Sequence, residues 1–124
     1  MAKARILVVD DEPDVLRVVA SILARAGYET TIAPGPLQAL EIISIRGGFD
    51  LVVSDVVMPQ MCGPELARQI RLLSPSSAVL LMSGCVPFLG QIPRGLPFLG
   101  KPFAASDLLR AVGRVLRESP GPSE

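Results

Sequence analysis

The sequence contains no histidine, and this absence excludes several kinds of chemistry. None of the 124 residues supplies an imidazole. The chain therefore has no general base of that type, no Ser-His-Asp triad and no histidine-ligated zinc site. Any acid–base or metal chemistry must use carboxylates, hydroxyls or amines.

Cysteines and long hydrophobic runs are also scarce. The two cysteines, Cys62 and Cys85, are too few and too far apart for a disulfide scaffold or a CxxC metal site. We expect free thiols in a reducing compartment rather than a redox pair. No apolar run approaches the roughly 20 residues that span a bilayer, and the N-terminus lacks a signal peptide. The sequence predicts a cytoplasmic protein with no membrane partner.

Net charge is absent as well. Twelve Lys and Arg residues balance twelve Asp and Glu residues, which argues against a nucleic-acid clamp and a polybasic membrane anchor. Hydrophobic residues make up 49% of the chain and charged residues 19%, so there is enough apolar material for a core. At this length we expect one domain.

Short β-branched runs recur along the chain and predict five strands. Three runs are continuously apolar, as in strands that are buried on both faces, and two shorter runs are candidates for edge strands. The buried strands are expected at Ile6–Val9, Leu51–Val53 and Ala78–Met82, and the edge strands at Tyr28–Ile32 and Phe98–Leu99.

Between and after these runs, apolar residues recur at the period of amphipathic helices. Glycine, proline or a capping residue marks the expected helix ends. The first helix runs from about Val15 to Ala26 and stops at Gly27, the second carries Leu37, Leu40 and Ile43 and ends at Gly47 and Gly48, the third opens at Gly63 and Pro64 and closes before Pro75, and the last begins with Ser106 as its N-cap.

Alternating strands and helices predict right-handed crossovers and a parallel sheet covered on both faces, which is a doubly wound α/β fold. The segment from Gly84 to Pro97 departs from this alternation, because its prolines and glycines leave little room for a regular helix. We expect the helix there to be short or irregular. The tail over residues 118–124 is expected to be disordered.

Polar residues follow several of the predicted strands, where an open parallel sheet binds its ligands. Asp10 and Asp11 follow the first strand, Asp55 the third, Ser83 the fourth and Lys101 the fifth. The topology therefore predicts that three carboxylates, one hydroxyl and one ammonium meet at a single edge of the sheet.

Three neighbouring carboxylates repel one another, and a hard divalent cation allows them to stay ionised. Oxygen ligands favour Mg²⁺ or Mn²⁺, and Mg²⁺ commonly completes its coordination with phosphate oxygens. Lys101 and the Ser83 hydroxyl are suited to hold further phosphate oxygens. Asp55 stands alone after the central strand, and we therefore expect it to be the nucleophile that attacks phosphorus.

These residues, in this order and spacing, resemble the receiver domain of two-component response regulators over about residues 4–117. The motifs are the acidic pair in ILVVDDE (6–12), Asp55 with Met58-Pro59 and Gly63, Ser83-Gly84, and Lys101-Pro102-Phe103. The resemblance implies a flavodoxin-like sheet of five strands in the order 2-1-3-4-5, helices on both faces, and no enzymatic activity beyond self-phosphorylation and autodephosphorylation.

The resemblance also implies the partners and the metal site. A histidine kinase or histidine phosphotransfer protein phosphorylates Asp55, and Asp10, Asp11, Asp55 and the backbone carbonyl of Val57 surround Mg²⁺. The chain is then a single-domain response regulator or a receiver excised from a hybrid histidine kinase. It acts on an unidentified downstream protein as a monomer or a weak dimer.

Further implications concern the switch. A cis peptide bond before Pro102 aims Lys101 at the phosphoryl group. Phe98 occupies the aromatic switch position and moves inward as Ser83 reaches that group.

Val57 and Cys85 depart from relatives whose phosphoryl groups are short-lived, because those relatives carry polar side chains at the matching positions. Neither residue orients an attacking water well. The sequence therefore predicts slow loss of the phosphoryl group.

Two other functions remain open. A pseudo-receiver binds partners without phosphorylation and is the main alternative. A small Mg²⁺-dependent phosphatase of the haloacid-dehalogenase type requires an acid two residues after its nucleophile, where this chain has Val57. A nucleotide- or flavin-binding module is disfavoured because no phosphate-binding glycine motif follows the first strand.

Overall fold

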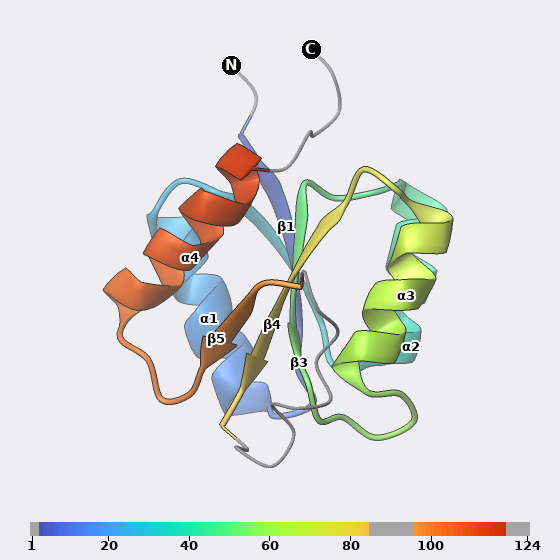
Figure 1. The fold of residues 1–124 in the computed structure, drawn as a ribbon, viewed down its shortest axis with the longest axis horizontal. Helices are drawn as coiled ribbons and strands as arrows, with labels where there is room; N and C mark the ends of the chain where they lie inside the picture. Colours follow the sequence, from blue (N-terminus) through green and yellow to red (C-terminus); the bar gives the residue numbers. More distant parts are fainter. Residues whose placement is uncertain (1–2, 85–95, 119–124) are drawn as a thin grey trace.

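The computed structural model describes residues 3–84 and 96–118 of the chain, which form three layers (Figure 1). The middle layer is a five-stranded parallel sheet in the order β2-β1-β3-β4-β5, which confirms the predicted doubly wound, flavodoxin-like topology. The strands are β1 (Arg5–Val9), β2 (Glu29–Ala33), β3 (Leu51–Asp55), β4 (Ala78–Ser83) and β5 (Phe98–Gly100).

Two pairs of helices cover the two faces of the sheet. One pair, α1 and α4, lies on the left of Figure 1, and α2 and α3 lie on the right. Their bounds are α1 (Pro13–Arg25), α2 (Pro36–Arg46), α3 (Gly63–Leu73) and α4 (Ala105–Glu118). Among the described residues, no helix is both long enough and apolar enough to cross a membrane.

The central strands are buried on both faces, as their unbroken apolar runs predict. In β1, Leu7 and Val9 belong to the core cluster under α2 and α3, whereas Ile6 and Val8 belong to the cluster under α1 and α4. This alternation follows from the two-residue repeat of a strand. Two separate apolar cores therefore hold β1 and β3 in place, and with them the residues at their carboxyl ends.

Two helices end at the glycines that the sequence indicates, whereas the start of the last helix differs from the prediction. Gly27 and Gly47 adopt positive φ angles of 100° and 84° just after α1 and α2, as expected of residues that end a helix. The prediction of Ser106 as an N-cap is wrong, because α4 begins at Ala105. The Asp107 carboxylate instead accepts the Ala104 N–H at 3.0 Å, so a side chain in the first turn satisfies a backbone donor at the helix start.

Two predictions concern segments outside the described residues. The short or irregular helix expected over 84–97 falls almost entirely on residues 85–95. The disordered tail expected over 118–124 starts one residue too early, because Glu118 is the last residue of α4; residues 119–124 lie outside the described residues.

The start of α3 lies very close to the end of β3. The Gly63 N–H donates to the Val56 carbonyl at 2.7 Å. A Cβ atom on Gly63 would lie 2.5 Å from the Asp55 carbonyl oxygen and 3.0 Å from the Val56 Cα. These neighbours are backbone atoms of a buried loop, so they cannot rotate away as a flexible side chain would. Only glycine permits this approach.

We therefore expect Gly63→Ala to lower the free energy of unfolding by about 1–3 kcal/mol, the usual cost of overpacking. The matched control is Gly113→Ala in α4, where the added Cβ would meet only the end of the Arg117 side chain. That change should raise stability by about 0.5–1 kcal/mol through helix propensity. Denaturant unfolding measures both values. A neutral Gly63→Ala variant would contradict the close approach.

Candidate functional site

Three carboxylates meet at the carboxyl edge of the sheet, as predicted. Asp10 and Asp11 follow β1, and Asp55 is the last residue of β3, its neighbour in the sheet. One carboxylate oxygen from each lies within 4.8 Å of the others. Asp10 is fully buried and Asp55 is 8% exposed, whereas Asp11 is exposed. The cluster therefore extends from the core to the surface.

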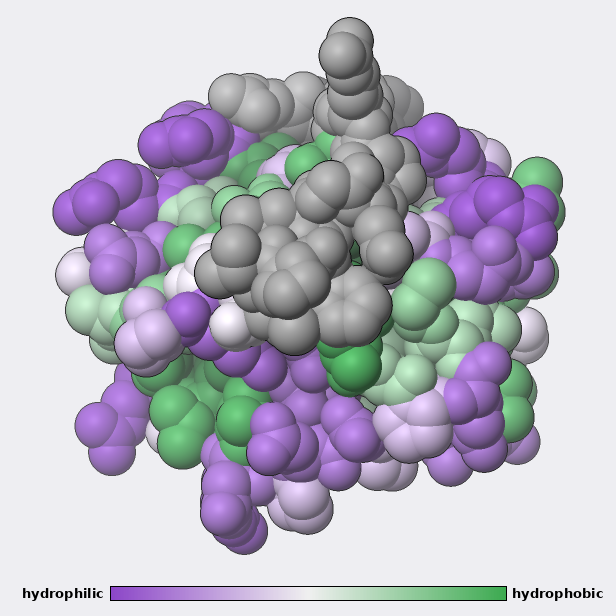
Figure 2. Space-filling view, turned by 60° about the horizontal axis from the view of Figure 1, so that its bottom comes forward, coloured by the Kyte–Doolittle hydropathy of each residue, from purple (hydrophilic) through white to green (hydrophobic). Residues whose placement is uncertain are grey.

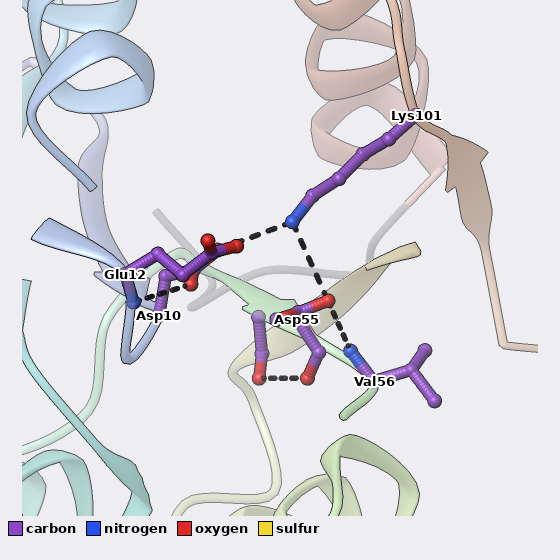
Figure 3. Close-up of polar contacts among 6 residues, drawn as sticks. Asp10, Glu12, Asp55, Val56 and Lys101 are labelled. Atoms are coloured by element: carbon purple, nitrogen blue, oxygen red, sulfur yellow. Dashed lines mark hydrogen bonds and ion pairs between the residues drawn. The ribbon is translucent and has the colours of Figure 1, made fainter. Parts of the chain in front are cut away.

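Lys101 joins this cluster from the end of β5. Its Nζ lies 3.4 Å from Asp10 Oδ2 and 3.5 Å from Asp55 Oδ1, and Figure 3 shows it reaching between the two carboxylates. The peptide bond before Pro102 is cis, as the resemblance implied. The structure thus brings together residues separated by 91 positions in the sequence.

Backbone donors orient the two buried carboxylates. Asp10 Oδ1 accepts the Glu12 N–H at 2.9 Å, and Asp55 Oδ1 accepts the Val56 N–H at 2.9 Å (Figure 3). Each of these carboxylates therefore has one backbone donor and shares the Lys101 ammonium. Such hydrogen bonds restrict the rotation of the acid groups.

These donors do not fully offset the effect of burial on the pKa of Asp55. Burial raises its pKa above the ordinary value, the Lys101 ammonium and the Val56 N–H oppose that shift, and the nearby Asp10 carboxylate adds to it. The net direction is upward, so the folded protein disfavours the ionised carboxylate.

The donor set is suited to a hard cation. Among the described residues it consists of carboxylate oxygens, which are the preferred ligands of hard divalent ions. Positive charge placed between the acids would offset the burial and the Asp10 repulsion that raise the pKa of Asp55. The residues present therefore fit a metal ion.

The other predicted site residues lie near the same edge but in different surroundings. Ser83 is the buried last residue of β4, and its carbonyl accepts the Lys101 N–H at 2.9 Å. Val57 lies in the loop after Asp55 with 45% of its surface exposed. Phe98 begins β5 and packs, partly buried, against the core under α2 and α3. Cys62 is a free, exposed thiol, and Cys85 lies outside the described residues.

One residue in contact with the site was not predicted from the sequence. Ser54 is fully buried, and its hydroxyl donates to the Asp55 carbonyl oxygen at 3.0 Å. Its signal in the sequence was a hydroxyl at the end of an otherwise apolar run. The orienting N–H groups of Glu12 and Val56 had no such signal, because every residue except proline carries a backbone donor.

A groove of about 570 Å³ adjoins the cluster between α1 and the segment that follows β5. Figure 2 shows the face at the carboxyl edge of the sheet, where hydrophobic and hydrophilic patches lie side by side. The lining of the groove is mostly apolar and includes Lys101; its other members are Asp14, Val15, Val18, Val19, Gly84, Pro102 and Phe103.

Comparisons with known proteins agree with this geometry. Among solved structures, that of the chemotaxis protein CheY4 from Vibrio cholerae superposes with a TM-score of 0.83 at 32% identity, covering 92% of this chain and 99% of CheY4. Among curated proteins, the response regulator receiver protein CpdR from Brucella abortus is 31% identical over 116 residues, which cover 90% of this chain and 96% of CpdR.

Longer proteins also match, but only over part of their length. The sensor kinase CckA from Brucella abortus is 37% identical over 122 residues, and the match covers 93% of this chain but 13% of CckA. The transcriptional regulator NtrC from Rhizobium meliloti is 35% identical, with 25% of its length covered. The model of the response regulator receiver domain matches residues 6–113. This chain therefore belongs to the receiver domain family of two-component response regulators.

Proposed function

We propose that this chain is a phosphorylation-dependent signalling switch in which Asp55 accepts a phosphoryl group. The observation that carries the proposal is the position of the Lys101 ammonium, 3.4 Å from Asp10 and 3.5 Å from Asp55 within a cluster of three acids. Membership of a family of signalling domains supports this reading. The proposed activity is self-phosphorylation and autodephosphorylation, without an outside substrate.

The phosphoryl donor is the phosphohistidine of a histidine kinase or a histidine phosphotransfer protein. An Asp55 carboxylate oxygen attacks phosphorus as the bond between phosphorus and the donor nitrogen breaks. The electron pair of that bond stays on the imidazole, which then takes up a proton. Lys101 stabilises the negative charge on the transferring phosphoryl oxygens. Because this chain contains no histidine, the imidazole must belong to another protein or another domain.

Asp10, Asp11, Asp55 and the Val57 backbone carbonyl would hold the Mg²⁺ or Mn²⁺ ion. The bound ion would supply the positive charge that the three acids lack and would neutralise phosphoryl oxygens. Asp10 and Asp55 already face one another through Lys101, so these two side chains need little rearrangement to share a ligand.

Phosphorylation then changes what the protein binds. In this proposal the Ser83 hydroxyl reaches the phosphoryl group and Phe98 moves inward from its partly buried position at the start of β5. The output is altered affinity for a downstream protein. We place this switch in the cytoplasm, as a monomer or a weak dimer.

The groove beside the cluster supports the assignment of a protein donor. Its mostly apolar lining includes the half-exposed Val18 on α1 and also Lys101, which contacts Asp55. A helix of the donor protein seated there would bring its phosphohistidine close to Asp55 and cover apolar surface at the same time.

Intact mass spectrometry after incubation with acetyl phosphate and Mg²⁺ tests the proposed function. The wild type should gain the mass of one phosphoryl group, and Asp55→Asn or a chelator should abolish the gain. The matched control is Asp50→Asn, which changes an acid at the opposite end of β3, where it accepts the Arg5 N–H; this variant should still be modified. A wild type that gains no mass would favour a pseudo-receiver, and an adduct on Asp55→Asn would refute the assigned acceptor.

Val57 yields a prediction about the lifetime of the phosphoryl group. Its side chain is apolar and 45% exposed two residues after the acceptor, where a polar side chain would orient an attacking water. Replacing Val57 with Asn, alone or together with Cys85→Glu, should accelerate autodephosphorylation by roughly tenfold, below the full effect of a general base. Loss of the mass adduct with time measures the decay.

The control for this experiment is Ile45→Asn, which places the same polar group on an exposed residue of α2. Its decay rate should equal that of the wild type. Equal decay of the Val57 variants and the wild type would show that this position does not set the lifetime.

A further inference from the structure

We propose that Ser54 is a positioning residue for phosphoryl transfer, acting through the peptide unit that joins Asp55 to Val56. The inference rests on the proposed function of Asp55 as the acceptor. It assigns to Ser54 the task of holding that peptide plane in the orientation in which its N–H contacts the reacting carboxylate.

The carbonyl end of this peptide unit is held from two sides. The Ser54 hydroxyl, which is fully buried, donates to the Asp55 carbonyl oxygen at 3.0 Å. On the other side, the Cα of Gly63 approaches so closely that a Cβ there would lie 2.5 Å from the same oxygen. The hydroxyl and the start of α3 therefore leave this carbonyl little freedom to rotate.

The N–H end of the same unit contacts the acceptor. The Val56 N–H lies 2.9 Å from Asp55 Oδ1 and also 2.9 Å from the Met82 carbonyl oxygen in β4. A peptide unit is planar and rigid, so a constraint on its carbonyl is also a constraint on its N–H. The Ser54 hydroxyl thereby acts on the Asp55 carboxylate without contacting it.

This arrangement matters for reactivity because Asp55 Oδ1 is also the oxygen that pairs with Lys101 Nζ, at 3.5 Å. A peptide plane that tilts would weaken the hydrogen bond from Val56 and let the carboxylate turn away from the ammonium. Attack on phosphorus requires close alignment of the reacting atoms, and small displacements lower the rate strongly. Loss of the hydroxyl should therefore reduce the rate of transfer much more than it reduces the folded population.

The test is the rate of phosphoryl uptake from acetyl phosphate with Mg²⁺, measured over a range of donor concentrations. In that reaction an Asp55 oxygen bonds to phosphorus and acetate leaves with the electron pair. Ser54→Ala should lower the maximal rate about tenfold and leave the half-saturating donor concentration within about twofold, because Ser54 does not touch the donor. Ser54→Thr, which retains the hydroxyl, should keep most of the wild-type rate.

The matched control is Ser74→Ala. Ser74 is also buried, its hydroxyl lies 2.8 Å from that of Ser77, and it follows α3 at the opposite end of the sheet. This variant should lose a similar amount of stability and none of the maximal rate. Denaturant unfolding of every variant gives the folded fraction by which each rate is corrected.

An unchanged maximal rate in Ser54→Ala would overturn the positioning role, and so would a loss in Ser54→Thr as large as that in Ser54→Ala. A similar loss in Ser74→Ala would also overturn it, because the effect would then be one of general stability. If the wild type itself takes up no phosphoryl group, the proposed function fails first and this inference fails with it.

Discussion

The crowding of three carboxylates, of which the two buried ones share one lysine, is the constraint on which the candidate site depends. Asp10, Asp11 and Asp55 place carboxylate oxygens within 4.8 Å of one another, and Lys101 offers one ammonium to the two buried acids. Burial is the main cause of the raised pKa of Asp55, and the nearby Asp10 carboxylate adds to it. Favourable packing in the rest of the fold must therefore hold these acids together. Added positive charge would reduce the cost of burying them side by side.

The fold supplies that packing through the two cores on either side of the sheet. β1 and β3 pair from Ile6 to Val9 with every partner buried, so their ends cannot separate without exposing apolar surface. Gly63 then allows α3 to start against the Asp55 carbonyl. Ser54 and Val56 act at the two ends of one peptide unit beside the acceptor. The reacting carboxylate is thus oriented by its own strand as well as by Lys101.

The sequence predicted those parts of the structure that depend on periodicity and on strand ends. Continuous apolar runs identified β1, β3 and β4, and the rule that ligands bind at the carboxyl ends of strands brought Asp10 and Lys101 together across 91 residues. The edge strands have weaker patterns, and β2 covers Glu29–Ala33 rather than the predicted Tyr28–Ile32. Its paired residues are less buried than those of β1, so its hydrophobic signal is weaker.

The features that the sequence did not predict depend on local backbone geometry. Asp107 replaces Ser106 as the side chain that satisfies a donor at the start of α4, and either residue type could serve at a helix N-terminus. The contact of Ser54 with the Asp55 carbonyl depends on a side-chain rotamer and a peptide orientation. A hydroxyl in an apolar run marks Ser54 as unusual, but the residue types do not show which acceptor it contacts.

The most direct test of the central constraint compares the unfolding free energies of wild type and Asp55→Asn, each in chelator and in Mg²⁺. In chelator the variant should be the more stable, because it removes a buried charge that the folded state disfavours. Mg²⁺ should stabilise the wild type more than the variant and narrow this gap, since the ion binds the folded cluster. A variant less stable than the wild type in chelator, or a wild type that Mg²⁺ does not stabilise, would contradict this account.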